Sequence, residues 1–162
     1  MFITLYGPDS YRRKEKLNEL VSSYKSKYKD IDVMFFDLRE NPDSWEEALD
    51  FLKQPSMFVE VKLAVVKEVS QVERKPWIDA LKKYKESKDV FIIISEEKKP
   101  NKKFSFLLKK PAQWQEFEEL EREKLRRFLA KKLEEEKDSS LEKVVKNKGQ
   151  ALLSKKLAII KK

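Results

Sequence analysis

The first chemistry that the sequence suggests is phosphate binding at the turn after its first apolar run. Residues Phe2–Tyr6 predict a buried strand, Gly7 and Pro8 a tight turn, and Asp9 or Ser10 the N-cap of a helix. In α/β nucleotide-binding proteins, the N–H groups at the start of this first helix hold a phosphate. Gly7, one of only two glycines in the chain, stands where a phosphate loop would begin.

The spacing after Gly7 departs from that of a phosphate loop. The motif G-x-x-x-x-G-K-[ST] needs a second glycine, a lysine for the β- and γ-phosphates and a hydroxyl for Mg²⁺. Counted from Gly7, these positions hold Arg12, Arg13 and Lys14. Arg13 preserves a positive charge, but the side chain at position 12 would obstruct a loop that wraps a phosphate. The third strand also ends in Lys-Glu, without the acidic pair of a Walker B motif. The sequence therefore predicts a nucleotide-type scaffold that does not hydrolyse ATP.

The composition excludes most catalytic and metal chemistry. The 162 residues include no cysteine and no histidine, which excludes disulfides, Cys/His zinc sites, thiol nucleophiles and histidine bases. We therefore expect a non-catalytic protein with no metal and no cofactor. No apolar run reaches the length of about 18 residues that a membrane span needs. The first apolar run is also too short for a signal sequence, so we expect a cytoplasmic protein.

The positive charge is concentrated at the end of the chain. Residues 131–162 contain ten lysines against five acidic residues, and so carry +5 of the net charge of +8. A basic tail can bind nucleic acid by releasing counterions, although a solvated helix face is the simpler explanation. The same two interpretations apply to Arg12, Arg13, Lys14 and Lys16, which lie in the first turns of the first helix.

Apolar runs and helical stripes alternate along the chain, and this pattern predicts an α/β fold. The fold class we expect is a three-layer, parallel five-stranded sheet with helices on both faces. The expected strands are Phe2–Tyr6, Ile31–Leu38, Val61–Val69, Val90–Ser95 and Gln113–Phe117. Helices are expected after Asp9 or Ser10, after Asp43 or Ser44, around Pro76, at Lys103–Lys110 and at Glu119–Lys137. Ile31–Leu38 is apolar enough to be covered on both faces, and Gln113–Phe117 suits a sheet edge.

A domain boundary is expected at Asp138-Ser139-Ser140, where polar residues follow the long charged helix. Residues 1–138 would form the α/β domain. Residues 139–162 place apolar side chains at helical spacing on either side of Gly149, and so predict a short, basic helical extension.

The segment from Gln54 to Phe58 places two large apolar residues directly after a Pro-Ser turn. In one interpretation, Met57 and Phe58 are buried at the start of the third strand. In the other they form a hydrophobic plug, because apolar side chains displayed on a turn are costly unless a partner covers them, and such anchors dominate interface energetics. The residues alone leave both interpretations open.

The order of these motifs resembles the first domain of the bacterial DNA polymerase III delta subunit, the clamp-loader component that opens the ring-shaped sliding clamp. The resemblance is carried by Leu5–Leu17, Asp37, Gln54–Phe58, Lys62–Val66, Val90–Ser95, Phe104–Lys110 and Trp114–Glu118. Each motif is short, but their order and spacing together are fairly specific. The similarity covers roughly residues 2–135.

The resemblance implies an AAA+-like fold, of the P-loop NTPase type, without a working ATP site. It implies that Met57 and Phe58 match the two hydrophobic residues that enter a pocket of the clamp, where Leu-Phe is common in the family. Ser56 and Gln54 would shape the turn. The implied role is clamp opening without catalysis, so any DNA polymerase activity would belong to the holoenzyme.

The resemblance also implies partners. The first is the sliding clamp, the beta subunit of polymerase III, and primed DNA is a second. A complete delta subunit continues into a helical lid and a collar that joins the other loader subunits. The sequence ends at Lys162, so residues 139–162 would be at most a remnant of the lid. Assembly with the other loader subunits is therefore left open.

A second hypothesis is a nucleic-acid-binding accessory protein. It would use Lys98, Lys99, Lys102, Lys103 and the basic tail to contact phosphates. The two hypotheses are compatible, because a clamp loader works on primed DNA. A third, an active nucleotide hydrolase, is disfavoured by the missing second glycine and the missing magnesium ligand.

Overall fold

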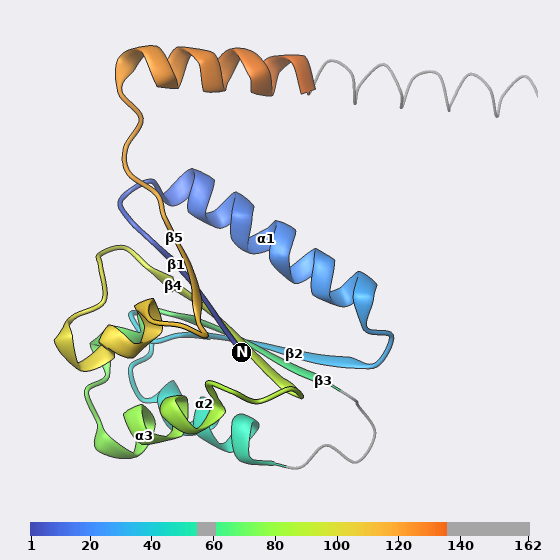
Figure 1. The fold of residues 1–162 in the computed structure, drawn as a ribbon, viewed down its shortest axis with the longest axis vertical. Helices are drawn as coiled ribbons and strands as arrows, with labels where there is room; N and C mark the ends of the chain where they lie inside the picture. Colours follow the sequence, from blue (N-terminus) through green and yellow to red (C-terminus); the bar gives the residue numbers. More distant parts are fainter. Residues whose placement is uncertain (55–60, 136–162) are drawn as a thin grey trace, which may run out of the picture. The chain divides into compact units, whose positions relative to one another are not determined.

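The structure is a computed structural model of the chain, and it describes residues 1–54 and 61–135. A first compact unit comprises Met1–Glu119. Its strands are β1 (Phe2–Tyr6), β2 (Ile31–Asp37), β3 (Val61–Lys67), β4 (Val90–Glu96) and β5 (Gln113–Glu116). Its α-helices are α1 (Ser10–Lys27), α2 (Ser44–Lys53) and α3 (Lys75–Tyr84), and its 3₁₀ helices are η1 (Val69–Gln71) and η2 (Lys102–Leu108). Figure 1 shows the order of these elements.

The five strands form one parallel sheet in the order β2-β3-β4-β1-β5. The predicted fold class is therefore confirmed, and so is the predicted place of β5 at a sheet edge. The most apolar strands, β3 and β4, pair with each other inside the sheet. β4 is buried along its whole length. Such strands need cover on both faces, as is usual in parallel sheets.

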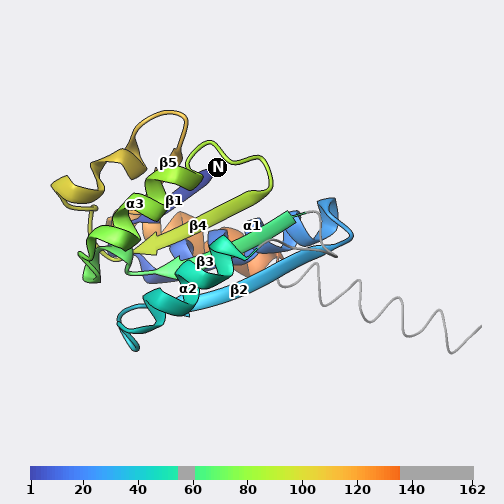
Figure 2. The same ribbon diagram turned by 90° about the horizontal axis from the view of Figure 1, so that it is seen from below.

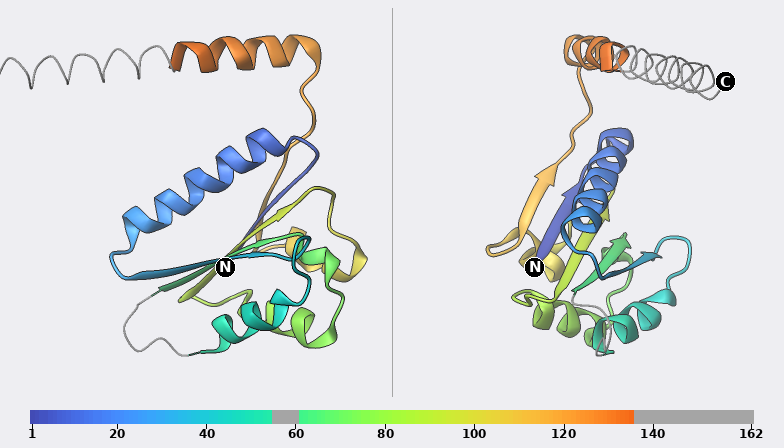
Figure 3. Two further views of the ribbon diagram at one scale, coloured as in Figure 1. Left: turned by 180° about the vertical axis from the view of Figure 1, so that it is seen from behind. Right: turned by 90° about the vertical axis from the view of Figure 1, so that its right-hand side faces the viewer.

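The helices form two layers, one on each face of the sheet (Figures 2 and 3). On one face α1 directs Leu17 and Val21 into a core with Leu5 and Phe91. On the other face α2, α3 and η2 pack on the sheet and bury, among others, Trp77. The two cores are separated by the sheet itself, because successive side chains of a strand point to opposite faces.

β2 does not match its prediction of cover on both faces. Phe35 is 59% exposed and Met34 is 41% exposed. The reason is the strand order, which places β2 at an edge of the sheet. α1 packs on β1 and β4, so no helix in the described part of the chain extends over the side chain of Phe35.

Several predicted boundaries also shift. The third strand was expected to reach Val69, but β3 ends at Lys67 because Glu68 takes a left-handed conformation with φ 54° and η1 follows. The short helix expected at Lys103–Lys110 is the 3₁₀ helix η2, Lys102–Leu108. Pro76 lies in the first turn of α3, as predicted.

A second unit comprises Leu120–Lys162, of which residues 122–135 are a described helix. Leu125, Leu129 and Leu133 of the predicted apolar stripe are exposed there. The predicted boundary at residues 138–140 and the predicted extension, residues 139–162, lie outside the described residues. Within those that are described, no helix is long and apolar enough to cross a membrane.

Candidate functional site

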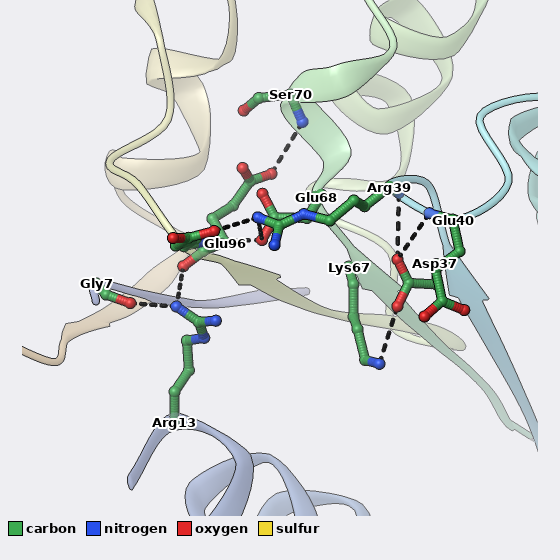
Figure 4. Close-up of polar contacts among 10 residues, drawn as sticks. Gly7, Arg13, Asp37, Arg39, Glu40, Lys67, Glu68, Ser70 and Glu96 are labelled. Atoms are coloured by element: carbon green, nitrogen blue, oxygen red, sulfur yellow. Dashed lines mark hydrogen bonds and ion pairs between the residues drawn. The ribbon is translucent and has the colours of Figure 1, made fainter. Parts of the chain in front are cut away.

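Residues that end or directly follow four of the strands lie together at the carboxyl edge of the sheet (Figure 4). Gly7 follows β1, Asp37 ends β2, Lys67 and Glu68 close β3, and Glu96 ends β4. Because parallel strands end at the same edge, these residues share the position at which open α/β sheets bind ligands. This is also the edge at which the sequence suggested a phosphate loop.

The turn between β1 and α1 is filled by groups of the chain itself. The guanidinium of Arg13 donates hydrogen bonds to the backbone carbonyls of Gly7 and of Glu96, the latter at 2.8 Å (Figure 4). Gly7 has a φ of +126°, and a Cβ atom at this position would lie 2.4 Å from the carbonyl oxygen of Phe117. Glycine is therefore needed here for close backbone approach and for its conformation.

Arg12 also has partners within the chain. Its Nε atom lies 2.6 Å from Oδ2 of Asp9, its guanidinium donates to the carbonyl of Glu118, and it lies over the ring of Phe117. Asp9 caps α1 as predicted, by accepting the backbone N–H of Arg12 at 3.0 Å. Partial burial acts to raise the pKa of Asp9, but the hydrogen bonds and charge of Arg12 outweigh it and lower that pKa. Arg12 and Arg13 are thus not simply a solvated face, because internal groups contact both guanidiniums.

Glu96 is the most buried carboxylate at this edge, with 3% of its surface exposed. Its Oε1 atom accepts the backbone N–H of Ser70 at 2.9 Å (Figure 4). Burial raises the pKa of Glu96 to about 7, and the charge of Glu68 adds to the rise, although the hydrogen bond from Ser70 opposes it. Glu68 is itself buried and accepts the backbone N–H of Glu97 at 2.8 Å. The two carboxylates therefore brace the loops that follow β3 and β4.

Ion pairs complete the carboxyl edge. Nζ of Lys67 lies 3.0 Å from Oδ2 of Asp37, and Arg39 pairs with Glu68 at 3.3 Å and with Glu97. Partial burial raises the pKa of Asp37, but the hydrogen bond and charge of Lys67 more than offset this, so the pKa is lowered. No group of three or more Asp or Glu in the described part of the chain is placed to hold a metal ion. The charged groups of this edge are therefore paired with one another.

Of the four predicted clamp-binding residues, the structure describes only one, Gln54. Ser56, Met57 and Phe58 lie outside the described residues. Gln54, the fourth, is exposed and forms the C-cap of α2, with its N–H donating to the carbonyl of Asp50 at 2.9 Å. The segment that carries them connects the end of α2 to the start of β3, and so leads to the amino edge.

Lys62, the second residue of β3, contacts the end of α2 from which this segment starts. It is only 7% exposed. Its Nζ donates to the carbonyls of Phe51 at 2.7 Å and Gln54 at 2.5 Å, and lies 4.8 Å from the centre of the Phe51 ring. Sequence analysis assigned Lys62 only to a strand. The signal that could have identified it is a lysine within an otherwise apolar run, because a buried ammonium needs acceptors.

The four lysines predicted to contact nucleic acid lie on the connection between β4 and the start of η2. All are exposed. Lys103 pairs with Glu73, and its hydrogen bond lowers the pKa of Glu73. The backbone N–H of Lys103 donates to Oδ1 of Asn101 at 2.9 Å. Lys98, Lys99 and Lys102 therefore lie on one exposed stretch, and Lys103 forms an ion pair with Glu73.

Comparison with known proteins is informative at the level of structure. No protein-family model matches the sequence, and no curated protein matches it. Among solved structures, the chain is similar to the Bacillus subtilis DNA clamp loader delta protein, with 26% sequence identity and a TM-score of 0.50. The match covers 74% of this chain and 38% of the Bacillus protein. The chain therefore has the fold of a DNA clamp loader delta protein over most of its length, and it spans well under half of the protein that it matches.

Proposed function

We propose that this chain is a clamp-binding component of a DNA clamp loader, which binds the sliding clamp through a hydrophobic plug and catalyses no reaction. The observation that carries the proposal is the fold shared with the Bacillus delta protein. Met57 and Phe58 would be the plug, with Ser56 and Gln54 shaping the turn. Other loader subunits and primed DNA are further partners that we propose on the same basis.

The arrangement of the sheet supports this division of roles. The carboxyl edge, where a nucleotide would bind, is filled by Arg13, Glu96 and their internal partners. The chain that carries the proposed plug leads into the amino end of β3, whereas this network lies at the carboxyl ends of the strands. A rigid sheet can present an apolar turn to a partner, because pre-organised anchors lose less entropy on binding.

The test is a pair of double variants that remove the same side chains from two places. Met57→Ala with Phe58→Ala should abolish binding to the sliding clamp of the same organism, because each lost hot spot costs about 2–4 kcal/mol. Met34→Ala with Phe35→Ala is the matched control, since it removes an adjacent, exposed Met-Phe pair from β2. Affinity would be measured by surface plasmon resonance, and folding by circular dichroism. Unchanged affinity in the folded plug variant would refute the proposal.

A second function, nucleic-acid binding, is favoured by the exposure of Lys98, Lys99 and Lys102 on one connection. Replacing all three by Gln should weaken binding to oligo(dT) and reduce the salt dependence by about 0.7 per lost phosphate contact. Replacing Lys82, Lys83 and Lys88 by Gln removes the same charge elsewhere and serves as the control. Equal oligo(dT) affinity for the two triple variants would exclude a specific role of this connection.

A further inference from the structure

We infer that Lys62 is the positioning residue of the proposed clamp-binding segment. Its ammonium ties the end of α2 to the start of β3, and thereby fixes the two points between which residues 55–60 run. The consequence for clamp binding rests on the proposed function. The tie itself rests only on contacts among described residues.

The backbone of Lys62 is a rigid base for this tie. In the register of the sheet it stands between Asp32 of β2 and Val90 of β4. Its N–H donates to the carbonyl of Asp89 at 2.9 Å. β3 is thus paired on both sides at the point where the chain enters it, and the Lys62 side chain extends from a strand that cannot easily shift.

The ammonium end of Lys62 meets the part of α2 that most needs a donor. The last four carbonyls of a helix have no partner within it, and together they carry the negative end of the helix dipole. Lys62 donates to two carbonyls at this end, those of Phe51 and Gln54. The contact with the Phe51 ring adds a cation–π attraction.

Packing alone does not call for a charge at this position. On the face of β3 that carries Lys62, the next side chains are the apolar, buried Ala64 and Val66, and an apolar side chain would be buried there without desolvating an ammonium. A buried cation is costly unless acceptors surround it. Its acceptors here are backbone carbonyls next to the proposed plug, so the geometry of Lys62 serves that end of α2.

The effect on binding follows from pre-organisation. A segment whose ends are held at a fixed separation loses less conformational freedom when a partner orders it. Replacing Lys62 by Met retains the length and apolar stem of the side chain but removes both hydrogen bonds. We expect about a 10-fold loss of clamp affinity, expressed mainly as faster dissociation. Lys62→Arg, which keeps a cationic donor, should stay within about 3-fold of the parent protein.

Three comparisons separate a positioning role from a general loss of stability. Lys67→Met is the matched control, because Lys67 lies on the same strand and pairs with Asp37 at the opposite edge. In a cycle with Phe58→Ala, Lys62→Met should weaken binding far less than it does in the parent protein, since its effect acts through the plug. Hydrogen exchange should be faster in Lys62→Met for the amides of Gln54 and Lys62, which donate to Asp50 and Asp89, and unchanged there in Lys67→Met.

The outcomes distinguish this inference from the proposed function. If the parent protein does not bind the clamp, the proposed function fails, and exchange at Gln54 and Lys62 still decides whether Lys62 ties the end of α2 to the start of β3. Unchanged exchange in Lys62→Met overturns the inference whatever the clamp does. Equal clamp affinity of Lys62→Met and the parent protein overturns it while the proposed function survives. If Lys62→Met is not folded by circular dichroism, Lys62→Gln, whose shorter side chain lacks the cation, replaces it in every comparison.

Discussion

Because of Glu96, the free energy of unfolding should decrease as pH rises, and Glu96→Gln should abolish that decrease. The pKa of Glu96 rises from an ordinary value of 4.5 to about 7 because the carboxyl is buried next to Glu68. Well below pH 4.5 the group is protonated in both the folded and the unfolded chain, so it contributes no difference. Between pH 4.5 and 7 the unfolded chain loses the proton while the folded chain keeps it, and the free energy of unfolding decreases with pH.

The size of this effect can be worked out from the two pKa values. At 1.36 kcal/mol for each pKa unit, the difference between 4.5 and about 7 corresponds to about 3 kcal/mol. Glutamine is neutral at every pH, and its Oε1 atom can still accept the N–H of Ser70. We therefore expect Glu96→Gln to match the parent protein at pH 4.5 and to exceed its free energy of unfolding by up to about 3 kcal/mol at pH 8.

The assay is urea unfolding of both proteins at half-unit steps from pH 4.5 to 8, followed by circular dichroism. Glu97→Gln is the control, because the hydrogen bond from Arg39 lowers the pKa of Glu97. The stability that Glu97 contributes is present above its ordinary pKa and lost on acidification, so its removal should bring no gain at pH 8. If the stability difference between Glu96→Gln and the parent protein is the same at pH 4.5 and pH 8, the reasoning about burial is wrong.

Three further predictions concern the carboxyl edge. Gly7→Ala should lower the free energy of unfolding by about 2 kcal/mol or more in urea titrations, because its Cβ would meet the Phe117 carbonyl and its φ is positive; an equally stable variant would contradict this contact. Arg13→Met should cost about 1–3 kcal/mol in the same titration, since the carbonyl of Gly7 loses a charged donor, and Mg-ATP should leave the melting temperature of both proteins unchanged. Asp37→Asn should lower the free energy of unfolding by about 0.5 kcal/mol at pH 7, a small cost because its partner Lys67 is half exposed. The lowered pKa of Asp37 stabilises the fold above the ordinary Asp pKa of 3.8, and this contribution is lost on acidification, so the variant should cost nothing well below pH 3.8. A cost that does not change with pH would refute the ion pair.

The fold could be predicted from the sequence because its signals are local. Residues 90–94 are a run of apolar residues that only a covered strand can use, and Asp9 stands at the start of a helix whose apolar stripe recurs at helical spacing. The alternation of such segments limits the topology to a parallel sheet. The exposure of Phe35 could not be predicted in this way, because it depends on the strand order and not on the composition of β2.

The contacts of the site depend on residues that are distant in the chain. Arg13 donates to the carbonyl of Glu96, which is 83 positions further on, so no spacing rule connects them. Near Gly7 the same arginine could equally have met a phosphate or water. Lys62 illustrates the opposite case, because its acceptors on α2 are near in sequence, but only the packing of α2 against β3 shows that they face it. The sequence pattern identified Arg13 as a candidate but not Lys62, and only the fold shows the partners of both residues.

The positions of Arg13 and Lys62 lead to one more expectation about how the two edges of the sheet relate. Both cations donate to backbone carbonyls, but Arg13 does so at the carboxyl ends of β1 and β4, and Lys62 at the amino end of β3. They share no partner, so their effects on stability should be additive. Their effects on clamp binding should not be alike, because only Lys62 contacts the end of α2 that leads to the proposed plug. Arg13→Met should therefore lower stability without changing clamp affinity, and Lys62→Met should change both. Equal losses of affinity would mean that clamp binding responds to stability alone, and that neither cation has a role in presenting the plug.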